Sequence, residues 1–302
     1  MVGSTRPGVW MSVLIGAGAL LVAGGALWAQ TAPATEIFLA PLTLSGDRVS
    51  VGRPVNVTNN PGYDNQPQFL PDSSGFLFSS NRDGRQTDIY RYDINEKRIV
   101  QVTRTGDNEY SPTMTPDGMT FTTIRGAEQK LWRFMMDGTD GGLAAAHMGL
   151  IGYHVWISPS RIATFILGAQ REPNTLQVLD LRTGAADTVE RSIGRSLLMR
   201  PGRGTVSFVH KPQGQPWVIK ELDPATRQMT TLVETLEGSE DLAWTPDGRI
   251  MMGQQGKLFV WQPGGQWREV ADLSRRGVAN ISRLTVSPDG RWIAIVSQAA
   301  AR

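Results

Sequence analysis

The tetrapeptides Thr115-Pro116-Asp117-Gly118, Thr245-Pro246-Asp247-Gly248 and Ser287-Pro288-Asp289-Gly290 are three copies of one motif. Only about a tenth of one Pro-Asp-Gly is expected by chance from this composition, so the copies indicate internal duplication. Degenerate copies stand at Leu70-Pro71-Asp72, Ser158-Pro159-Ser160 and Arg200-Pro201-Gly202. The six prolines, at positions 71, 116, 159, 201, 246 and 288, follow one another at intervals of 45, 43, 42, 45 and 42 residues. The sequence therefore predicts six copies of one structural unit.

Each unit contains four short runs of residues that favour β-strands. The first run ends just before the proline, as in Leu242-Ala243-Trp244, and the second follows the turn, as in Trp292-Ile293-Ala294-Ile295. The third and fourth are typified by Phe259-Val260-Trp261 and Thr231-Leu232-Val233. In the turn, proline presets the backbone and glycine takes the position that tolerates a side chain least. Four strands in a unit of about 40 to 45 residues are typical of a propeller blade, so the pattern predicts an all-β, six-bladed β-propeller.

The two ends of the array predict how the ring closes. The sixth repeat begins near Ile281 and contains only its first two strands before the chain stops at Arg302. Segments that resemble the missing strands lie at the other end, at Glu36-Ile37-Phe38-Leu39 and Val55-Asn56-Val57-Thr58. We therefore expect the N-terminal strands to complete the C-terminal blade, which removes open sheet edges. A linear β-solenoid is the structural alternative, although its units usually repeat at shorter periods.

The first 34 residues differ from the rest of the chain. No charged residue occurs between Arg6 and Glu36, and the stretch from Met11 to Ala29 is almost continuously apolar. This pattern is typical of a signal peptide, but the run is also long enough to act as an uncleaved membrane anchor. We expect residues 1–34 to be one or the other and residues 35–302 to form the propeller. Both alternatives place the propeller outside the cytoplasm, in the periplasm or secreted, with membrane contact only through an uncleaved N-terminal segment.

Composition excludes several classes of function. There is no cysteine, which excludes disulfides, thiolate metal sites and cysteine nucleophiles. Only His147, His154 and His210 could supply imidazole ligands, and they occupy unrelated repeat positions, so we expect neither metal nor cofactor. The formal net charge is only +2, without a long basic run, which argues against nucleic acid as a partner.

The repeats resemble those of the TolB-like propeller family. The copy from Gln66 to Thr103 carries the resemblance best, with Pro71-Asp72, Ser80-Asn81-Arg82-Asp83-Gly84 and Asp88-Ile89-Tyr90. The resemblance covers the chain after Glu36 but not the N-terminal α/β domain of TolB, for which we expect no room here. It implies the propeller fold and an extracytoplasmic location. Repeats three and four lack the Asp-Gly turn, which leaves their strand boundaries open.

The resemblance also implies where a partner would bind. In this family the residues just before the innermost strand of each blade surround the mouth of the central channel. By repeat position these are Tyr63, Asp64, Asn65, Glu109, Tyr110, Tyr153, His154, Arg195, Glu240, Asp241, Ser282 and Arg283. Their mixed charges and three tyrosines suit a peptide or protein segment. The alternative is that they are ordinary loop residues, in which Asp, Asn and Ser are common.

Three functions remain open at this stage, one of which is a purely structural scaffold anchored by Met11 to Ala29. Another is a non-enzymatic, exported module that binds a protein or peptide partner of the cell envelope. The third is a carbohydrate lyase or hydrolase, with His154 and Glu109, Glu240 or Asp241 as acid and base. No Gly-x-Ser-x-Gly elbow, Walker loop or dinucleotide fingerprint occurs. We interpret the repeated Asp117, Asp247 and Asp289 as turn residues and assign them no catalytic role.

Overall fold

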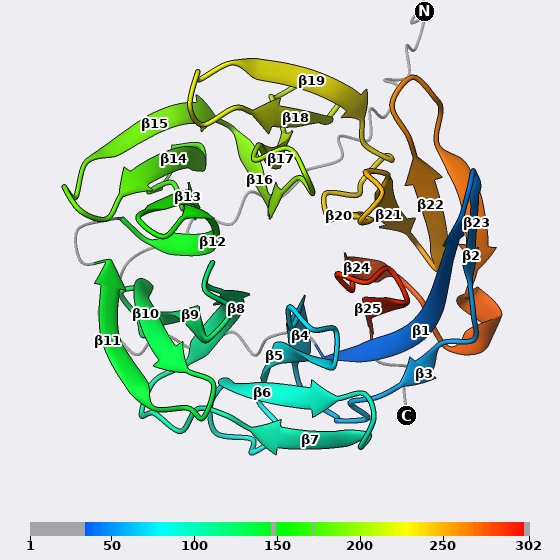
Figure 1. Cartoon of the computed structure of the whole chain (residues 1–302), viewed down its shortest axis with the longest axis horizontal. Helices are drawn as coiled ribbons and strands as arrows, with labels where there is room; N and C mark the ends of the chain where they lie inside the picture. Colours follow the sequence, from blue (N-terminus) through cyan, green and yellow to red (C-terminus); the bar gives the residue numbers. More distant parts are fainter. Residues whose placement is uncertain (1–33, 146–148, 171, 299–302) are drawn as a thin grey trace, which may run out of the picture. The chain divides into compact units, whose positions relative to one another are not determined.

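Six antiparallel sheets stand around a central axis and form a closed ring in the computed structural model (Figure 1). The structure describes residues 34–145, 149–170 and 172–298. The predicted signal or anchor segment and His147 lie outside these residues. Within the described part of the chain, no helix is long and apolar enough to cross a membrane. The prediction of an all-β, six-bladed propeller is confirmed, and the linear solenoid is excluded.

Five blades are each built from four consecutive strands. Blade 1 contains β4 (Asp64–Phe69), β5 (Gly75–Ser80), β6 (Asp88–Asp93) and β7 (Arg98–Gln101). Blade 2 contains β8 (Glu109–Met114), β9 (Thr120–Arg125), β10 (Lys130–Met135) and β11 (Asp140–Ala145). Blade 3 contains β12 (Ile151–Ser158), β13 (Arg161–Ile166), β14 (Thr175–Asp180) and β15 (Ala186–Arg191). Blade 4 contains β16 (Ile193–Met199), β17 (Val206–His210), β18 (Val218–Leu222) and β19 (Met229–Glu234). Blade 5 contains β20 (Leu242–Trp244), β21 (Ile250–Gln254), β22 (Lys257–Trp261) and β23 (Arg268–Asp272), followed by the short 3-10 helix η1 (Ser274–Arg276).

Blade 6 combines the two ends of the described chain, as predicted. Its inner strands are β24 (Ile281–Val286) and β25 (Trp292–Gln298), and its third strand is β1 (Thr35–Ser45). β1 pairs with β25 over seven residues, with Phe38 opposite Ile295. The predicted fourth strand is present only as the two-residue β3 (Val55–Asn56), which pairs with Phe38 and Leu39. The hairpin from β1 to β2 (Arg48–Val51) was not anticipated; its tight turn places Gly46 at a φ of 51°, a conformation that favours glycine.

The repeated Pro-Asp-Gly segments form turns at the ends of the inner strands. Asp117 Oδ1 accepts hydrogen bonds from Thr115 Oγ1 at 2.7 Å and from Met119 N at 2.8 Å. These bonds hold the pKa of Asp117 below its usual value because they stabilise the carboxylate. Asp247 and Asp289 accept the corresponding hydroxyl bond from Thr245 and Ser287, each at 2.6 Å. The interpretation of these three aspartates as turn residues is therefore confirmed.

Hydrophobic side chains pack between neighbouring sheets, so the core is spread around the ring. The cluster between blades 6 and 1 includes Ile37, Phe76, Phe78 and Ala294, all fully buried. Because each core fills the space between two blades, none of them fills the axis of the ring. The axial space is lined mainly by the inner strands and by the loops around them, and these carry the candidate site.

Candidate binding site in the central channel

The first residues of the inner strands line one end of the channel. The residue six positions before each repeat proline belongs to this lining in all six blades: Asn65, Tyr110, Tyr153, Arg195, Glu240 and Ser282. Together with neighbouring residues they enclose a cavity of about 1020 Å³, which we call the mouth cavity. The repeat therefore places one polar or aromatic side chain per blade at the same height around the axis.

Nine of the twelve predicted mouth residues line this cavity: Tyr63, Asn65, Tyr110, Tyr153, Arg195, Glu240, Asp241, Ser282 and Arg283. The other three do not. Asp64 and Glu109 are fully buried, and His154 lines a different part of the channel. Successive side chains of a strand point to opposite sides, so neighbours in sequence cannot all face the axis. Strict counting from the repeat proline would have excluded Asp64 and Glu109, which stand seven positions before it.

An ion-paired cluster forms the floor of the mouth cavity. Asp241, only 6% exposed, accepts hydrogen bonds from Arg195 Nε at 2.8 Å and Arg195 Nη2 at 2.5 Å. Its other oxygen lies 3.5 Å from Arg283 Nη1. Arg195 Nη2 also donates to the carbonyl of Ser282 at 2.9 Å. Burial alone would lower the pKa of Arg195, but Asp241 outweighs it, so this guanidinium stays charged.

Arg283 connects the ion-paired cluster to Tyr153 on the other side of the channel. Its Nη2 donates to Tyr153 Oη at 3.2 Å, and its guanidinium lies 5.0 Å from the centre of the Tyr153 ring. Tyr153 belongs to blade 3 and Arg283 to blade 6, which stand opposite each other in a ring of six. This contact therefore bars the channel below the mouth cavity.

A second ion pair, between Lys211 and Glu240, lies at the wall of the mouth cavity. Of these two residues, only Glu240 was predicted from the sequence. Lys211, in the loop after β17, pairs with Glu240, and Glu240 Oε1 also lies 3.2 Å from Arg195 Nε. The Lys211 ammonium rests 3.9 Å from the centre of the Trp217 ring. Both residues belong to the loop between β17 and β18, which corresponds to the Ser80-Asn81-Arg82-Asp83-Gly84 loop between β5 and β6 but differs from it in sequence. They were not predicted, because the prediction took only residues near the start of each inner strand.

Two further tyrosines complete the lining. The rings of Tyr63 and Tyr110 meet edge to face, with centroids 6.2 Å apart. Burial raises the pKa of Tyr63, so its hydroxyl remains protonated. Aromatic rings with a polar tip offer large contact areas as well as hydrogen bonds. This side of the mouth cavity is thus aromatic, whereas the opposite side is charged.

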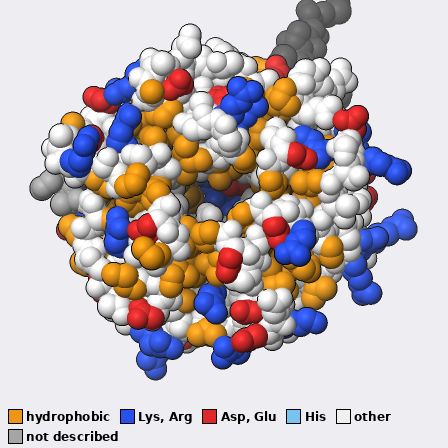
Figure 2. All heavy atoms as spheres, in the orientation of Figure 1, with side chains coloured by type: hydrophobic (Ala, Val, Ile, Leu, Met, Phe, Trp, Pro, Cys, Tyr) orange, Lys and Arg blue, Asp and Glu red, His pale blue; other side chains and the backbone are white. Residues whose placement is uncertain are grey.

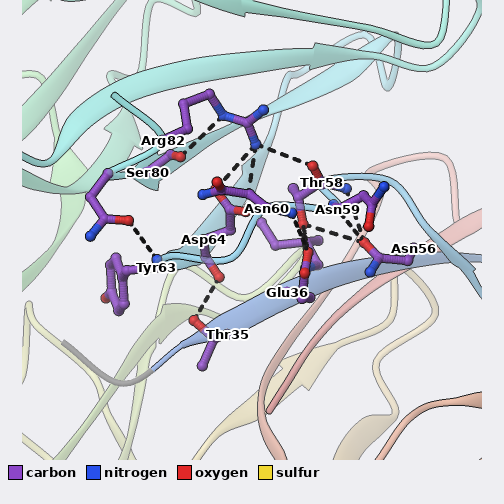
Figure 3. Close-up of polar contacts among 12 residues, drawn as sticks. Thr35, Glu36, Asn56, Thr58, Asn59, Asn60, Tyr63, Asp64, Ser80 and Arg82 are labelled. Carbon is purple, nitrogen blue, oxygen red and sulfur yellow. Dashed lines mark hydrogen bonds and ion pairs between the residues drawn. The ribbon is translucent and has the colours of Figure 1, made fainter. Parts of the chain in front are cut away.

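Asp64 belongs to the closure of the ring and not to the mouth (Figure 3). It pairs with Arg82, whose Nη2 lies 3.3 Å from Asp64 Oδ1 and also donates to the carbonyl of Thr58. Close by, Glu36 Oε2 accepts from Thr58 Oγ1 at 2.9 Å and from the backbone of Asn60 at 3.0 Å. These bonds tie the segment after β3 to both β1 and blade 1. The function of Asp64 is therefore structural.

Glu109 and His154 do not form an acid and base pair at the mouth. Burial raises the pKa of Glu109 to about 7, and its Oε1 accepts from Thr105 Oγ1 at 2.9 Å. Burial lowers the pKa of His154 to about 3, and its Nε2 lies 2.6 Å from Thr122 Oγ1. Glu240 and Asp241 are committed to the ion pairs described above. The proposed acid and base residues thus occupy three separate environments.

The channel continues below the floor as a second cavity of about 590 Å³. Tyr153, Arg195, Asp241, Arg283 and Leu284 line both cavities and form the partition between them. The walls of the second cavity are mostly apolar: Met114, Val155, Trp156, Leu198, Met199, Trp244, Val286 and four repeat prolines. Figure 2 shows the hollow at the centre of the ring, with hydrophobic side chains gathered around it on this face.

The described residues contain no group of three or more histidines and carboxylates arranged to hold a metal ion. The mouth cavity instead offers donors, acceptors and aromatic faces. These groups can form hydrogen bonds, ion pairs and aromatic contacts.

Comparison with solved structures identifies the same fold in proteins of diverse function. A structure assigned to TolB of Agrobacterium tumefaciens matches with a TM-score of 0.65 and 14% identity, covering 89% of this chain and 100% of that one. A chain of a nidogen/laminin complex matches with a TM-score of 0.63 and 9% identity, covering 83% and 97%. Oligogalacturonate lyase from Vibrio parahaemolyticus matches with a TM-score of 0.52 and 14% identity, covering 88% and 98%.

No protein-family model matches the chain, and no curated protein matches it. The resemblance to TolB-like propellers is thus confirmed at the level of the fold. Since the similar structures include an enzyme and a protein complex, the fold does not decide the function. The function therefore has to be inferred from the residues that line the channel.

Proposed function

We propose that this protein is an exported, non-enzymatic propeller that holds a peptide or protein segment in its mouth cavity. The observation that supports this most directly is the composition of that cavity. Six blades contribute to it, and their side chains include three tyrosines and an ion-paired cluster of arginines and carboxylates. Tyrosine and arginine are the residues that most often dominate binding at protein interfaces.

The charges of the mouth cavity suit a polypeptide better than a strongly charged polymer. Its lining contains the cations Arg195, Lys211 and Arg283, and the anions Glu237, Glu240 and Asp241. Such a balance offers both signs to a partner, while the tyrosines supply apolar contact. A rigid ring of sheets also presents these groups without a large entropic cost of ordering on binding.

Photocrosslinking tests the location of the binding site. A photoreactive residue at Asn65 should give adducts of defined size with a partner of the cell envelope when the full chain is expressed in its native host. The same residue at Met119, which is 70% exposed on a Pro-Asp-Gly turn, is the matched control and should give none. The substitution Tyr110→Ala should reduce the Asn65 adducts. Equal adducts from Asn65 and Met119 would contradict a mouth site.

Export is part of the proposal and has its own test. The basis is the uncharged, apolar stretch from Met11 to Ala29. Mass spectrometry of the purified protein should find a mature N-terminus near Gln30 or Thr35 if a signal is cleaved, or residue 1 retained in a membrane fraction if the segment is an anchor. Recovery of the intact chain from the cytoplasm would contradict both.

A carbohydrate-cleaving enzyme is the alternative, favoured by the structural similarity to an oligogalacturonate lyase. In this chain, however, His154 is buried against Thr122, Glu109 is fully buried, and Asp241 and Glu240 are engaged in ion pairs. An activity screen against polyuronides, lactones and glycosides, with and without divalent metal, distinguishes the two functions. Turnover that is abolished by His154→Gln would favour the enzyme.

A further inference from the structure

The floor and wall of the mouth cavity contain more positive than negative charge in their connected ion pairs. Arg195, Arg283 and Lys211 are linked to only two carboxylates, Asp241 and Glu240. Each carboxylate is shared: Asp241 lies between the two arginines, and Glu240 between Arg195 and Lys211. Arg195 is the residue common to both. One cationic charge in this connected cluster therefore has no carboxylate of its own.

Arg195 is the most exposed of the three cations, although it already pairs with both carboxylates. Its side chain is 35% exposed, compared with 15% for Arg283 and 28% for Lys211. Its Nε and Nη2 are occupied by Asp241 and the Ser282 carbonyl. Its Nη1 makes no hydrogen bond within the described residues. A guanidinium fixed on one edge, with its remaining donors open to a cavity, is suited to a carboxylate.

Of the other two cations, Lys211 pairs directly with Glu240, whereas Arg283 has only the 3.5 Å contact with Asp241 and a buried Nε without a hydrogen-bond partner in the described residues. Without Arg195, Asp241 would still lie 3.5 Å from Arg283, and Glu240 would still pair with Lys211. Gly194 lies beside this arrangement, where a Cβ would meet Lys211 Cδ at 3.0 Å and Glu240 Oε2 at 3.1 Å. By charge count alone the cluster would balance with one cation fewer, although Asp241 would then lose both of its hydrogen bonds.

The bar across the channel limits what can approach Arg195. Because Arg283 and Tyr153 join opposite blades below the mouth cavity, an extended polypeptide cannot continue straight through the channel. A segment that enters must either turn back or end there. A chain that ends at the floor places its terminal carboxylate beside Arg195.

We propose that Arg195 anchors the C-terminal carboxylate of a peptide bound in the mouth cavity. This inference rests on the proposed peptide-binding function and specifies the chemistry of the ligand. The carboxylate supplies the anion that the cluster lacks, and the tyrosines contact the preceding residues. An acidic side chain carries the same group, so the test has to distinguish the two sources.

The probe is a pool of N-acetylated tripeptides, prepared both as free acids and as C-terminal amides. Binding to the full chain is detected by saturation-transfer NMR, and individual ligands are then titrated. We expect the acids to bind about 10-fold or more tightly than the matching amides, because the amide cannot form a charge-assisted pair. Tripeptide amides with an internal Asp or Glu serve as the arm for side-chain carboxylates and should bind as weakly as other amides.

Variants assign the effect to Arg195. Arg195→Gln should reduce the affinity for acids to that for amides, and Arg195→Lys should retain part of the difference. Glu240→Gln, which removes a competing carboxylate, should tighten acid binding. Arg182→Gln removes an equal charge from an exposed ion pair with Asp180, away from the channel, and should change nothing. Arg195→Gln also removes two hydrogen bonds from the nearly buried Asp241 and should lower the thermal midpoint, so the affinities for acids and amides are compared well below the unfolding transition of each variant.

The outcomes separate this inference from the proposed function. Equal binding of acids and amides, or acid binding that survives Arg195→Gln, overturns the carboxylate anchor even if mouth crosslinks persist. Tight binding of amides with an internal acidic residue overturns the chain terminus as the source. Binding of a galacturonic acid trimer, with no peptide bound and no crosslinked partner, overturns both the peptide ligand and the proposed function.

Discussion

Truncating one buried side chain in β1 tests the closure of the ring quantitatively. Ile37 is fully buried in the cluster between blades 6 and 1, where it packs with Phe76 and Ala294. The substitution Ile37→Ala removes three carbon atoms, worth about 2.4 kcal/mol at roughly 0.8 kcal/mol each. The cavity left behind raises the expected loss in unfolding free energy to about 2 to 5 kcal/mol. We expect the urea midpoint, followed by tryptophan fluorescence, to fall accordingly.

Val55→Ala is the matched control within the same closing segment. Val55 lies in β3, pairs with β1 through its backbone, and is 59% exposed. Its truncation should change stability by less than about 0.5 kcal/mol. If Ile37→Ala were as mild as Val55→Ala, β1 would not be an integral strand of blade 6, and the closed ring would be wrong.

Three further predictions concern buried ionisable groups. Arg82→Gln leaves the fully buried Asp64 without its cation and should cost about 3 kcal/mol, part of which the double variant with Asp64→Asn should restore in chemical denaturation. Glu109 has a folded pKa of about 7, above its ordinary 4.5, so its contribution to stability is present at acidic pH and is lost as the pH rises toward 7. Glu109→Gln should therefore gain stability relative to wild type with increasing pH, by up to about 1.4 kcal/mol per pH unit, and a constant difference from pH 4 to 8 would refute the raised pKa. His154 has a folded pKa of about 3, below its ordinary 6.5, so its contribution to stability is present above pH 6.5 and is lost as the pH falls. The thermal midpoint of His154→Gln should therefore rise relative to that of wild type as the pH is lowered from 6 to 4.

Most of the fold could be predicted because the repeat is local and regular. Turns such as Thr245-Pro246-Asp247-Gly248 depend on hydrogen bonds within four or five residues, so the sequence specifies them directly. Repeats three and four lost the Asp-Gly pair, yet both form four-stranded blades. The hairpin of β1 and β2 was missed, because it lies outside the repeating pattern.

The candidate site was predicted in part. Repeat position correctly predicted that residues from all six blades meet at one cavity. It did not show which of these side chains face the cavity and which face the interior of a blade. Asp64 and Glu109 were included by repeat position, just before the inner strand, but both side chains are fully buried. Lys211 and Trp217 were missed, since they lie in the loop between β17 and β18 and the prediction considered only residues near the start of each inner strand.

The sequence by itself determined the number of blades, their strand order and the partner strands that close the ring. These properties follow from a period and from alternation along the chain, both of which are local. Only the tertiary structure decided that Arg195, Asp241, Arg283 and Tyr153 meet, because they come from four blades and are up to 130 residues apart. Their pairing, and the excess of one cation over the carboxylates of the cluster, depend on distances across the axis of the ring, and no local pattern encodes such distances.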